Sequence, residues 1–120
     1  MVTLDRYTLT HYAGPMANWR VVPGLPLLVS DEGEVCSGVK MFAFPLRADP
    51  NIKGYLRVRV VIDGVRYRYF VHHLVLRAFV GPRLPGMETN HDDFDKTNNR
   101  LSNLAYVTQK ENSDHYLATL

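Results

Sequence analysis

The chain has 120 residues, of which 46% are hydrophobic and 22% are charged, and its formal net charge is +2. This length and apolar content fit one compact domain with a modest core. The single cysteine, Cys36, excludes an internal disulfide and a zinc site built on paired cysteines. No apolar run is long enough to cross a bilayer, and the first residues lack the pattern of a signal peptide. We therefore expect a soluble protein of the cytoplasm.

Charge is distributed unevenly along the chain. Residues 1–52 contain four basic and five acidic groups, a balance of −1, whereas residues 53–83 contain seven basic groups and one acidic group, a balance of +6. Residues 84–120 contain three basic and six acidic groups, a balance of −3. A basic segment directly before an acidic, amide-rich one indicates a polyanionic partner next to a polar site.

The first part of the chain predicts a small β meander that follows an extended arm. Residues 1–18 show no sustained periodicity and contain Gly14-Pro15, which is typical of an arm with little structure of its own. Pro23-Gly24 and a polar turn at residues 30–33 divide the next segment into short β-rich runs. We expect strands at residues 19–22, 27–30, 34–37 and 41–44, and a loop at residues 48–54.

A β-hairpin is predicted in the basic segment, because Asp63-Gly64 separates β-rich runs at residues 55–62 and 65–70 and suits a type I′ turn. A two-residue loop places Arg59 opposite Arg68, and like charges directly across a strand pair disfavour a sheet unless an anion lies over them. The face is either an anion-binding surface or an ordinary solvated sheet face. The arginines that share it are Arg57, Arg59, Arg66 and Arg68.

The second half of the chain predicts helical structure at two places. Apolar residues at helical spacing indicate a helix at residues 71–80, which Gly81-Pro82 ends. Residues 87–120 have the pattern of a strand, a long polar turn, a second strand and a helix that begins with a capping box, Thr108 and Glu111. The expected fold class is α+β, with one domain at residues 19–120. Its β-rich part is 19–70, and its helix and strand–strand–helix part is 71–120.

The segment from Thr89 to Asn112 resembles the motif of the HNH endonucleases, the ββα-metal fold, in the form found in homing-type enzymes of phages and mobile introns. Three features carry the resemblance: the Asn-His pair at residues 90–91, Asn98-Asn99 followed by Ser102-Asn103-Leu104, and an Asn-bearing helix after Val107-Thr108. Their joint spacing is specific, although each feature alone is weak.

Upstream segments extend the resemblance to about residues 19–116. Residues 71–75 and 78–79 look like the Val-His-Arg-Leu-Val and Ala-Phe pattern that precedes the motif, with His73 in place of the usual Arg. Residues 19–37 are similar to the small DNA-binding module of these enzymes. Asn90 occupies a place often held by Asp. Homing-type relatives commonly add carboxy-terminal DNA-binding helices, and the sequence ends at Leu120, so we expect modest sequence specificity.

By this resemblance the protein is a metal-dependent endonuclease that hydrolyses phosphodiester bonds of double-stranded DNA, in a bacterial or phage-infected cell. His91 is the implied general base, since an imidazole with an ordinary pKa of about 6.5 suits proton transfer near neutral pH. Asn90 and Asn112 are the implied ligands of one Mg²⁺ or Mn²⁺ ion, with His115 as a further ligand or phosphate contact. One such site is expected to nick a single strand.

Other residues are expected to support the site or to contact DNA. Asn103 should tie the long turn to the backbone and so hold His91. His72 borders the apolar face of its helix and is expected to be a hydrogen-bonded packing residue that supports the site. His73 and Arg77 share an exposed face, which suits either a phosphate contact or solvation. The hairpin arginines are the other expected DNA contacts.

Alternative interpretations stay open at this stage. A calcium loop starting at Asp93 lacks glycine at its sixth position, Asn98, and glutamate at its twelfth, Leu104. A catalytically inactive HNH-fold protein that binds DNA or regulates is the main alternative function, and a protein-interaction domain is another. The basic hairpin disfavours the last of these. The sequence leaves the recognition site, the oligomeric state and the biological role open.

Overall fold

The computed structural model describes residues 17–37 and 44–119. Within them the chain forms three antiparallel sheets and two α-helices, so the α+β class is confirmed. The first sheet, in the order β1-β2-β3-β4, is the expected meander, with Trp19 opposite Ser30 and Leu28 opposite Cys36. Its strands are β1 (Trp19–Val21), β2 (Leu27–Ser30), β3 (Val35–Ser37) and β4 (Phe44–Pro45). Residues 1–16 of the arm expected at 1–18, and most of the strand expected at 41–44, lie outside the described residues.

The predicted hairpin forms strands β6 (Leu56–Ile62) and β7 (Val65–Phe70) of the second sheet, with Arg59 opposite Arg68 as expected. Asp63 and Gly64 have φ angles of 50° and 78°, the positive values that a type I′ turn requires. The prediction of a loop at residues 48–54 is wrong in part, because β5 (Asp49–Pro50) pairs with the start of β6. Two residues are too few to show a periodicity of two, and the proline is tolerated because β5 is an edge strand.

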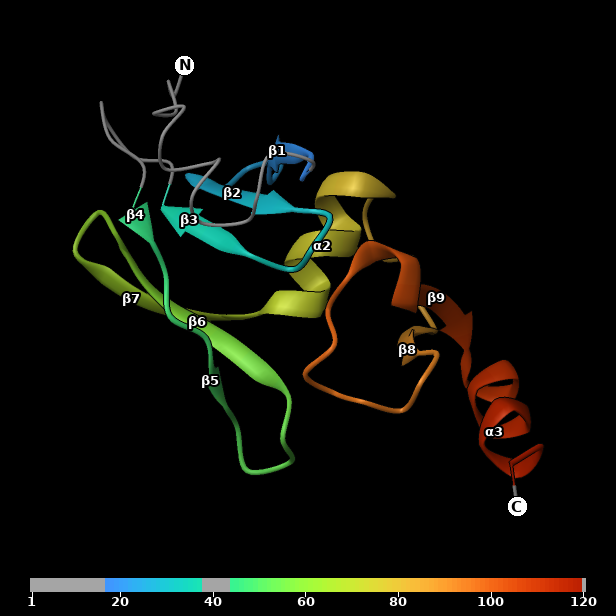
Figure 1. Ribbon diagram of the computed structural model, residues 1–120. Helices are drawn as coiled ribbons and strands as arrows, with labels where there is room; N and C mark the ends of the chain where they lie inside the picture. The colour runs from blue at the N-terminus through green and yellow to red at the C-terminus, as the bar shows by residue number, and fades with distance from the viewer. Residues whose placement is uncertain (1–16, 38–43, 120) are drawn as a thin grey trace.

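Helix α2 (Val71–Phe79) occupies the centre of the molecule. It contacts strands of all three sheets, and in Figure 1 it lies between the meander and hairpin on one side and the carboxy-terminal part of the chain on the other. Its buried residues join those of the strands in one apolar cluster, which contains Val22, Leu27, Val29, Val35, Val58, Val60, Val71, Leu74, Val75, Leu76 and Leu104. The meander, the hairpin and the carboxy-terminal unit thus share a core.

The carboxy-terminal unit has the expected order of strand, turn, strand and helix. Strands β8 (Met87–His91) and β9 (Leu104–Thr108) pair along their whole length, a 3₁₀ turn, η1 (Leu101–Asn103), precedes β9, and helix α3 (Gln109–Leu117) follows it. The predicted capping box is present, since Thr108 Oγ1 accepts from the Glu111 amide and Glu111 Oε1 accepts from the Thr108 amide.

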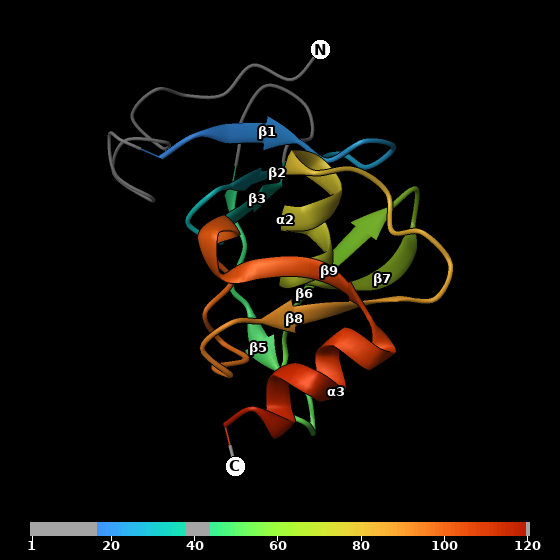
Figure 2. The ribbon, with the colours of Figure 1, turned by 90° about the vertical axis from the view of Figure 1, so that its right-hand side faces the viewer.

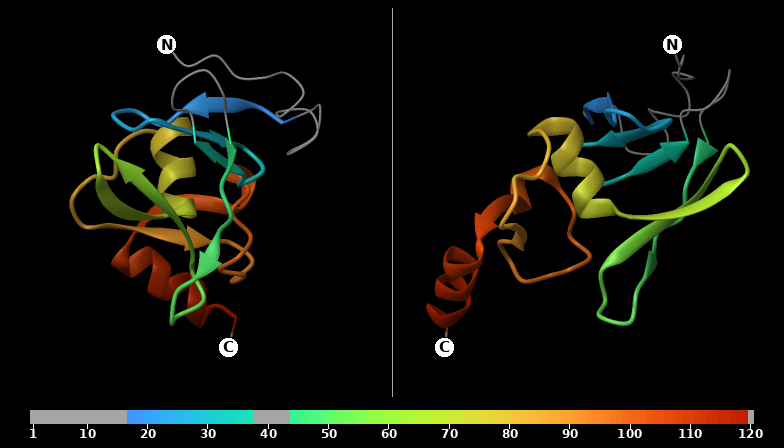
Figure 3. Two further views of the ribbon diagram at one scale, coloured as in Figure 1. Left: turned by 90° about the vertical axis from the view of Figure 1, so that its left-hand side faces the viewer. Right: turned by 180° about the vertical axis from the view of Figure 1, so that it is seen from behind.

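Helix α3 packs beside β8 and β9 and none of its residues is fully buried. In Figure 2 it runs below the two strands, and in the right-hand view of Figure 3 it and the β6–β7 hairpin extend to opposite sides of α2. No helix in the described part of the chain combines the length and the apolar character that a membrane span needs.

Candidate active site

A cleft of about 560 Å³ lies at the ββα unit, between the end of β8, the turn that follows it and helix α3. It brings together Asn90 and His91 at the end of β8 with Asn112 in the second turn of α3. Residues from the two ends of the motif, the Asn90-His91 pair and Asn112, therefore line one cavity. Tyr55 and Lys96 line it as well, so the loop before β6 and the long turn complete its walls.

His91 is held by a buried hydrogen bond. The residue is 6% exposed, and its Nε2 lies 2.9 Å from Oδ1 of Asn99, a residue that is 4% exposed. A carbonyl oxygen can only accept, so Nε2 carries the hydrogen and Nδ1 of the neutral ring carries the lone pair. Nδ2 of Asn99 is buried and has no hydrogen-bond partner among the described residues.

The side chain of Asn112, on α3, is oriented by a hydrogen bond to β8. Its Nδ2 donates to Oε2 of Glu88 at 2.8 Å, and this hydrogen bond links α3 to β8. Glu88 and Asn90 are two residues apart on one strand, so they share a face of the β8–β9 pair. The strand face that carries Asn90 therefore also carries the carboxylate that binds Asn112.

The long turn between β8 and β9 is built around Asn103. Its Nδ2 donates to Asp93 Oδ1 and to the Asn98 carbonyl, both at 2.9 Å, and its Oδ1 accepts from the Asp93 amide. The Asn98 side chain and the other hydrogen bonds to the Asp93 carboxylate hold the pKa of that group below its usual range. The Asp92 amide also donates to the Asn103 carbonyl, which fixes the turn directly after His91.

His115 is placed away from the cleft lining. Its Nε2 lies 3.1 Å from the Asp92 carbonyl oxygen, and its ring stacks on Phe94 with centroids 4.6 Å apart. Phe94, with φ of 63°, is a non-glycine residue in the left-handed region. These contacts attach α3 to the turn, and His115 is not among the residues that line the cleft.

His72 packs against the ring of His91. It is 5% exposed, and its ring packs edge-on against those of Tyr55 and His91, with centroids 5.4 and 5.2 Å away. Burial, with smaller contributions from His73 and His91, lowers the pKa of His72 to about 3. It packs as expected, but its Nδ1 has no hydrogen-bond partner among the described residues, so the expectation of a hydrogen-bonded ring fails at that atom.

Comparisons with known proteins agree with this geometry. Residues 69–114 match the family model described as HNH endonuclease. The chain is 30% identical over 102 residues to the uncharacterised HNH endonuclease L245 of Acanthamoeba polyphaga mimivirus, covering 80% of this chain and 30% of that protein. The solved structure described as "DNA binding and cleavage by the HNH homing endonuclease I-HmuI" superposes with a TM-score of 0.75 at 31% identity, covering 85% of this chain and 59% of the other.

Residues 69–114 belong to the HNH endonuclease family. A further relative is the SPbeta prophage protein YosQ of Bacillus subtilis (strain 168), which bears the name of an HNH homing endonuclease. It is 47% identical over 47 residues, covering 39% of this chain and 27% of that protein. The chain thus spans less than a third of either curated relative. The predicted family is confirmed.

The cleft lined by Asn90, His91 and Asn112, here called the HNH cleft, offers uncharged oxygen atoms as ligands for a metal ion. Asn90 and Asn112 supply amide oxygens, which suit a hard divalent cation. In the residues that the structure describes, no group of three or more His, Cys, Asp or Glu side chains is placed to hold a metal ion. The buried hydroxyl of Thr89, which lines the cleft and lacks a hydrogen-bond partner in the same residues, adds one polar oxygen. The residues fit a weakly held ion that also needs ligands from a substrate.

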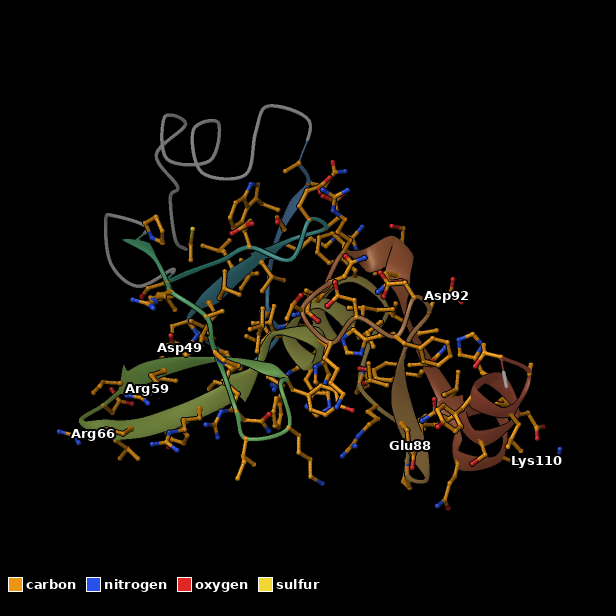
Figure 4. All side chains as sticks on the ribbon, turned by 60° about the horizontal axis from the view of Figure 1, so that its bottom comes forward. Asp49, Arg59, Arg66, Glu88, Asp92 and Lys110 are labelled. Atoms are coloured by element: carbon orange, nitrogen blue, oxygen red, sulfur yellow. The ribbon has the colours of Figure 1, made fainter. Side chains whose placement is uncertain are left out.

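The expected DNA-contacting residues lie outside the HNH cleft. Arg59, Arg66 and Arg68 are exposed on the β6–β7 hairpin and Arg57 is half-buried; Figure 4 labels Arg59 and Arg66, far from Glu88 on β8. None of the four forms an ion pair with a carboxylate in the described residues. His73 is half-buried, and burial is the main cause that lowers its pKa.

Arg77 differs from the expectation for an exposed phosphate contact. Its guanidinium donates to the Pro23 carbonyl, so it attaches α2 to the turn after β1.

The sequence predicted no role for Asn99 or Glu88. The Asn98-Asn99 pair was part of the motif, but nothing in it distinguishes the side chain that reaches His91. A signal for Glu88 was its position two residues before Asn90, which places both on one strand face.

Proposed function

We propose that the protein is a metal-dependent DNA endonuclease of the HNH type that nicks one strand of duplex DNA, with His91 as general base. The observation that carries the proposal is that Asn90, His91 and Asn112 line one cleft, while the Nε2 atom of His91 is occupied by Asn99. A fixed tautomer leaves Nδ1 free to accept a proton, as general-base catalysis requires. The family membership and the likeness to a DNA-cleaving homing endonuclease support the same reaction.

In the proposed reaction a water molecule attacks the phosphorus of a phosphodiester. Nδ1 of His91 takes one proton from that water, a new P–O bond forms, and one P–O ester bond breaks. Asn99 holds the imidazole in orientation throughout, and Asn103 keeps the turn after His91 in place. One bound Mg²⁺ or Mn²⁺ ion, held by Asn90 and Asn112, would supply positive charge against the charge that develops on the phosphoryl group and the leaving oxygen.

The hairpin arginines are the proposed docking surface for duplex DNA. Arg59 and Arg68 face each other across β6 and β7, and neither pairs with a carboxylate in the described part of the chain. A polyanion over this face would relieve their repulsion. Contacts to phosphates would make binding sensitive to salt and largely independent of sequence. The viral and prophage relatives suit an enzyme of phage-infected cells.

Plasmid nicking tests the proposal. Supercoiled plasmid is incubated with the protein and Mg²⁺ or Mn²⁺, with and without chelator. We expect metal-dependent open-circular product that is lost in His91→Ala, by about 10²- to 10⁴-fold as for removal of a general base, while DNA binding persists. DNA binding without nicking in either metal would favour the alternative of an inactive HNH-fold DNA-binding protein. Absence of both binding and nicking would contradict the proposal as a whole.

A further inference from the structure

Glu88 is a half-buried carboxylate that the HNH motif does not account for. It lies on β8 opposite Val107, and its Oε2 accepts a hydrogen bond of 2.8 Å from Nδ2 of Asn112. No lysine, arginine or histidine forms an ion pair with it in the described part of the chain. In Figure 4 the labelled Glu88 lies on β8 beside α3. The carboxylate is therefore directed at the asparagine rather than at a cation.

The chemistry of this contact determines which end of the Asn112 amide faces the cleft. An asparagine side chain has a donor end and an acceptor end of nearly equal size, so shape alone does not fix its orientation. An ionised carboxylate can only accept. The Nδ2 end of Asn112 must therefore turn toward Glu88, which leaves Oδ1 for the cleft that Asn112 lines and Glu88 does not.

We propose that Glu88 is a positioning residue that holds Oδ1 of Asn112 toward the metal-binding cleft and thereby sets the affinity of the site for a divalent ion. The inference rests on the proposed function, since it needs a metal in that cleft. The negative charge behind the amide also polarises Asn112 and makes its oxygen a better ligand. Groups that orient metal ligands in this way are typically worth about 10- to 100-fold in metal affinity or activity.

A purely structural role for Glu88 is the competing explanation. No residue of α3 is fully buried, so the helix depends on a few polar and aromatic contacts, of which Asn112–Glu88 is one and the stacking of His115 on Phe94 is another. Loss of Glu88 could loosen α3 without any effect specific to the ligand oxygen. The test must therefore compare variants of equal charge and similar size that differ in the ability to accept a hydrogen bond.

Glu88→Gln and Glu88→Met form that matched pair. Both remove the charge and keep the side-chain length, but the amide oxygen of the glutamine can still accept from Asn112, whereas the thioether of the methionine is only a weak acceptor. Asp114→Asn is the control, because it removes a carboxylate from an exposed part of the same helix, where Asp114 pairs with Lys110. All are made in a His91→Ala background, so that a duplex oligonucleotide stays uncut, and Mn²⁺ binding to each protein–DNA complex is titrated by electron paramagnetic resonance.

We expect Mn²⁺ affinity to fall about 10- to 100-fold in Glu88→Met, to fall less in Glu88→Gln, and to be unchanged in Asp114→Asn. DNA affinity without metal and the thermal unfolding midpoint of Glu88→Gln should match those of the parent. Equal Mn²⁺ affinities for the glutamine and methionine variants, or no loss in either, would overturn the positioning role. If the parent complex itself binds no Mn²⁺, the proposed metal site fails, which is a separate result.

Discussion

The hydrogen bond between Asn99 and His91 predicts that a substitution of Asn99 lowers cleavage activity but leaves the free energy of unfolding nearly unchanged. Asn99→Leu keeps a side chain of similar size in a site that is 4% exposed, but it removes the acceptor that fixes the His91 tautomer. The buried Nε2 edge of His91 is then left without its partner, which costs about 1–3 kcal/mol. The change also removes the buried Nδ2 of Asn99, which has no partner among the described residues and carries a penalty of about the same size, about 1–3 kcal/mol.

The two contributions to stability nearly cancel, so the free energy of unfolding of Asn99→Leu should stay within about 1 kcal/mol of the parent value. No such cancellation applies to catalysis, because the group that is lost orients His91, the proposed general base. If the rate loses the full value of the hydrogen bond, about 1–3 kcal/mol, single-turnover nicking should slow roughly 5- to 150-fold.

Urea unfolding measures the free energy of unfolding, and single-turnover plasmid nicking at saturating protein measures the cleavage rate. Ser102→Ala, an exposed position in the same turn, is the control and should change neither. Wild-type nicking by a folded Asn99→Leu protein would refute the argument that Asn99 fixes the base. A loss of stability well above about 3 kcal/mol would show instead that the residue serves mainly to hold the fold.

Three further predictions follow from the geometry. Replacing Arg59 and Arg68 together by Ala should weaken DNA binding alike for unrelated sequences and lower the slope of log K against log salt by about 2, measured by fluorescence anisotropy. Asn103→Ala removes three hydrogen bonds of the turn and should lower the free energy of unfolding by about 1–3 kcal/mol in a urea titration, with slower nicking. The pKa of His72 is about 3 in the folded state against 6.5 ordinarily, so its neutral form contributes stability that is present above about pH 6.5 and is lost as pH falls toward 3. Thermal unfolding of His72→Phe should therefore depend less on pH in that range than unfolding of the parent does, and equal dependence would contradict the assignment.

Local signals in the sequence predicted much of this fold. The Asp63-Gly64 turn fixed the register of the hairpin, because a two-residue loop leaves one pairing of its strands, and the capping box located the start of α3. The family resemblance, through its spacing, pointed to His91 and Asn112, which the structure places in one cleft. These are short-range patterns or motif spacings, and each can be read without knowing how distant segments pack.

The features that sequence reasoning missed depend on contacts between distant segments. β5 is visible only through its pairing with β6, and Arg77 is engaged by a carbonyl 54 positions earlier. Asn99 and its neighbour Asn98 are the same residue type, yet one reaches His91 and the other reaches Asp93. Side-chain direction in an irregular turn is set by the whole turn, so a linear pattern does not show it.

The turn between β2 and β3 bears on how enzymes of this kind could be recombined. A Cβ atom at Gly33 would lie 2.9 Å from the carbonyl oxygen of Asn99, the Leu101 amide donates to the Asp31 carbonyl, and Arg100 pairs with Glu32 at 3.1 Å. The turn of the amino-terminal meander thus contacts the segment whose Asn99 holds His91. A chimaera that takes residues 19–37 from one relative and the nuclease unit from another would need both sides of this junction from the same parent. Exchange of the meander alone should therefore lower the rate of DNA cleavage even where the chimaera still folds.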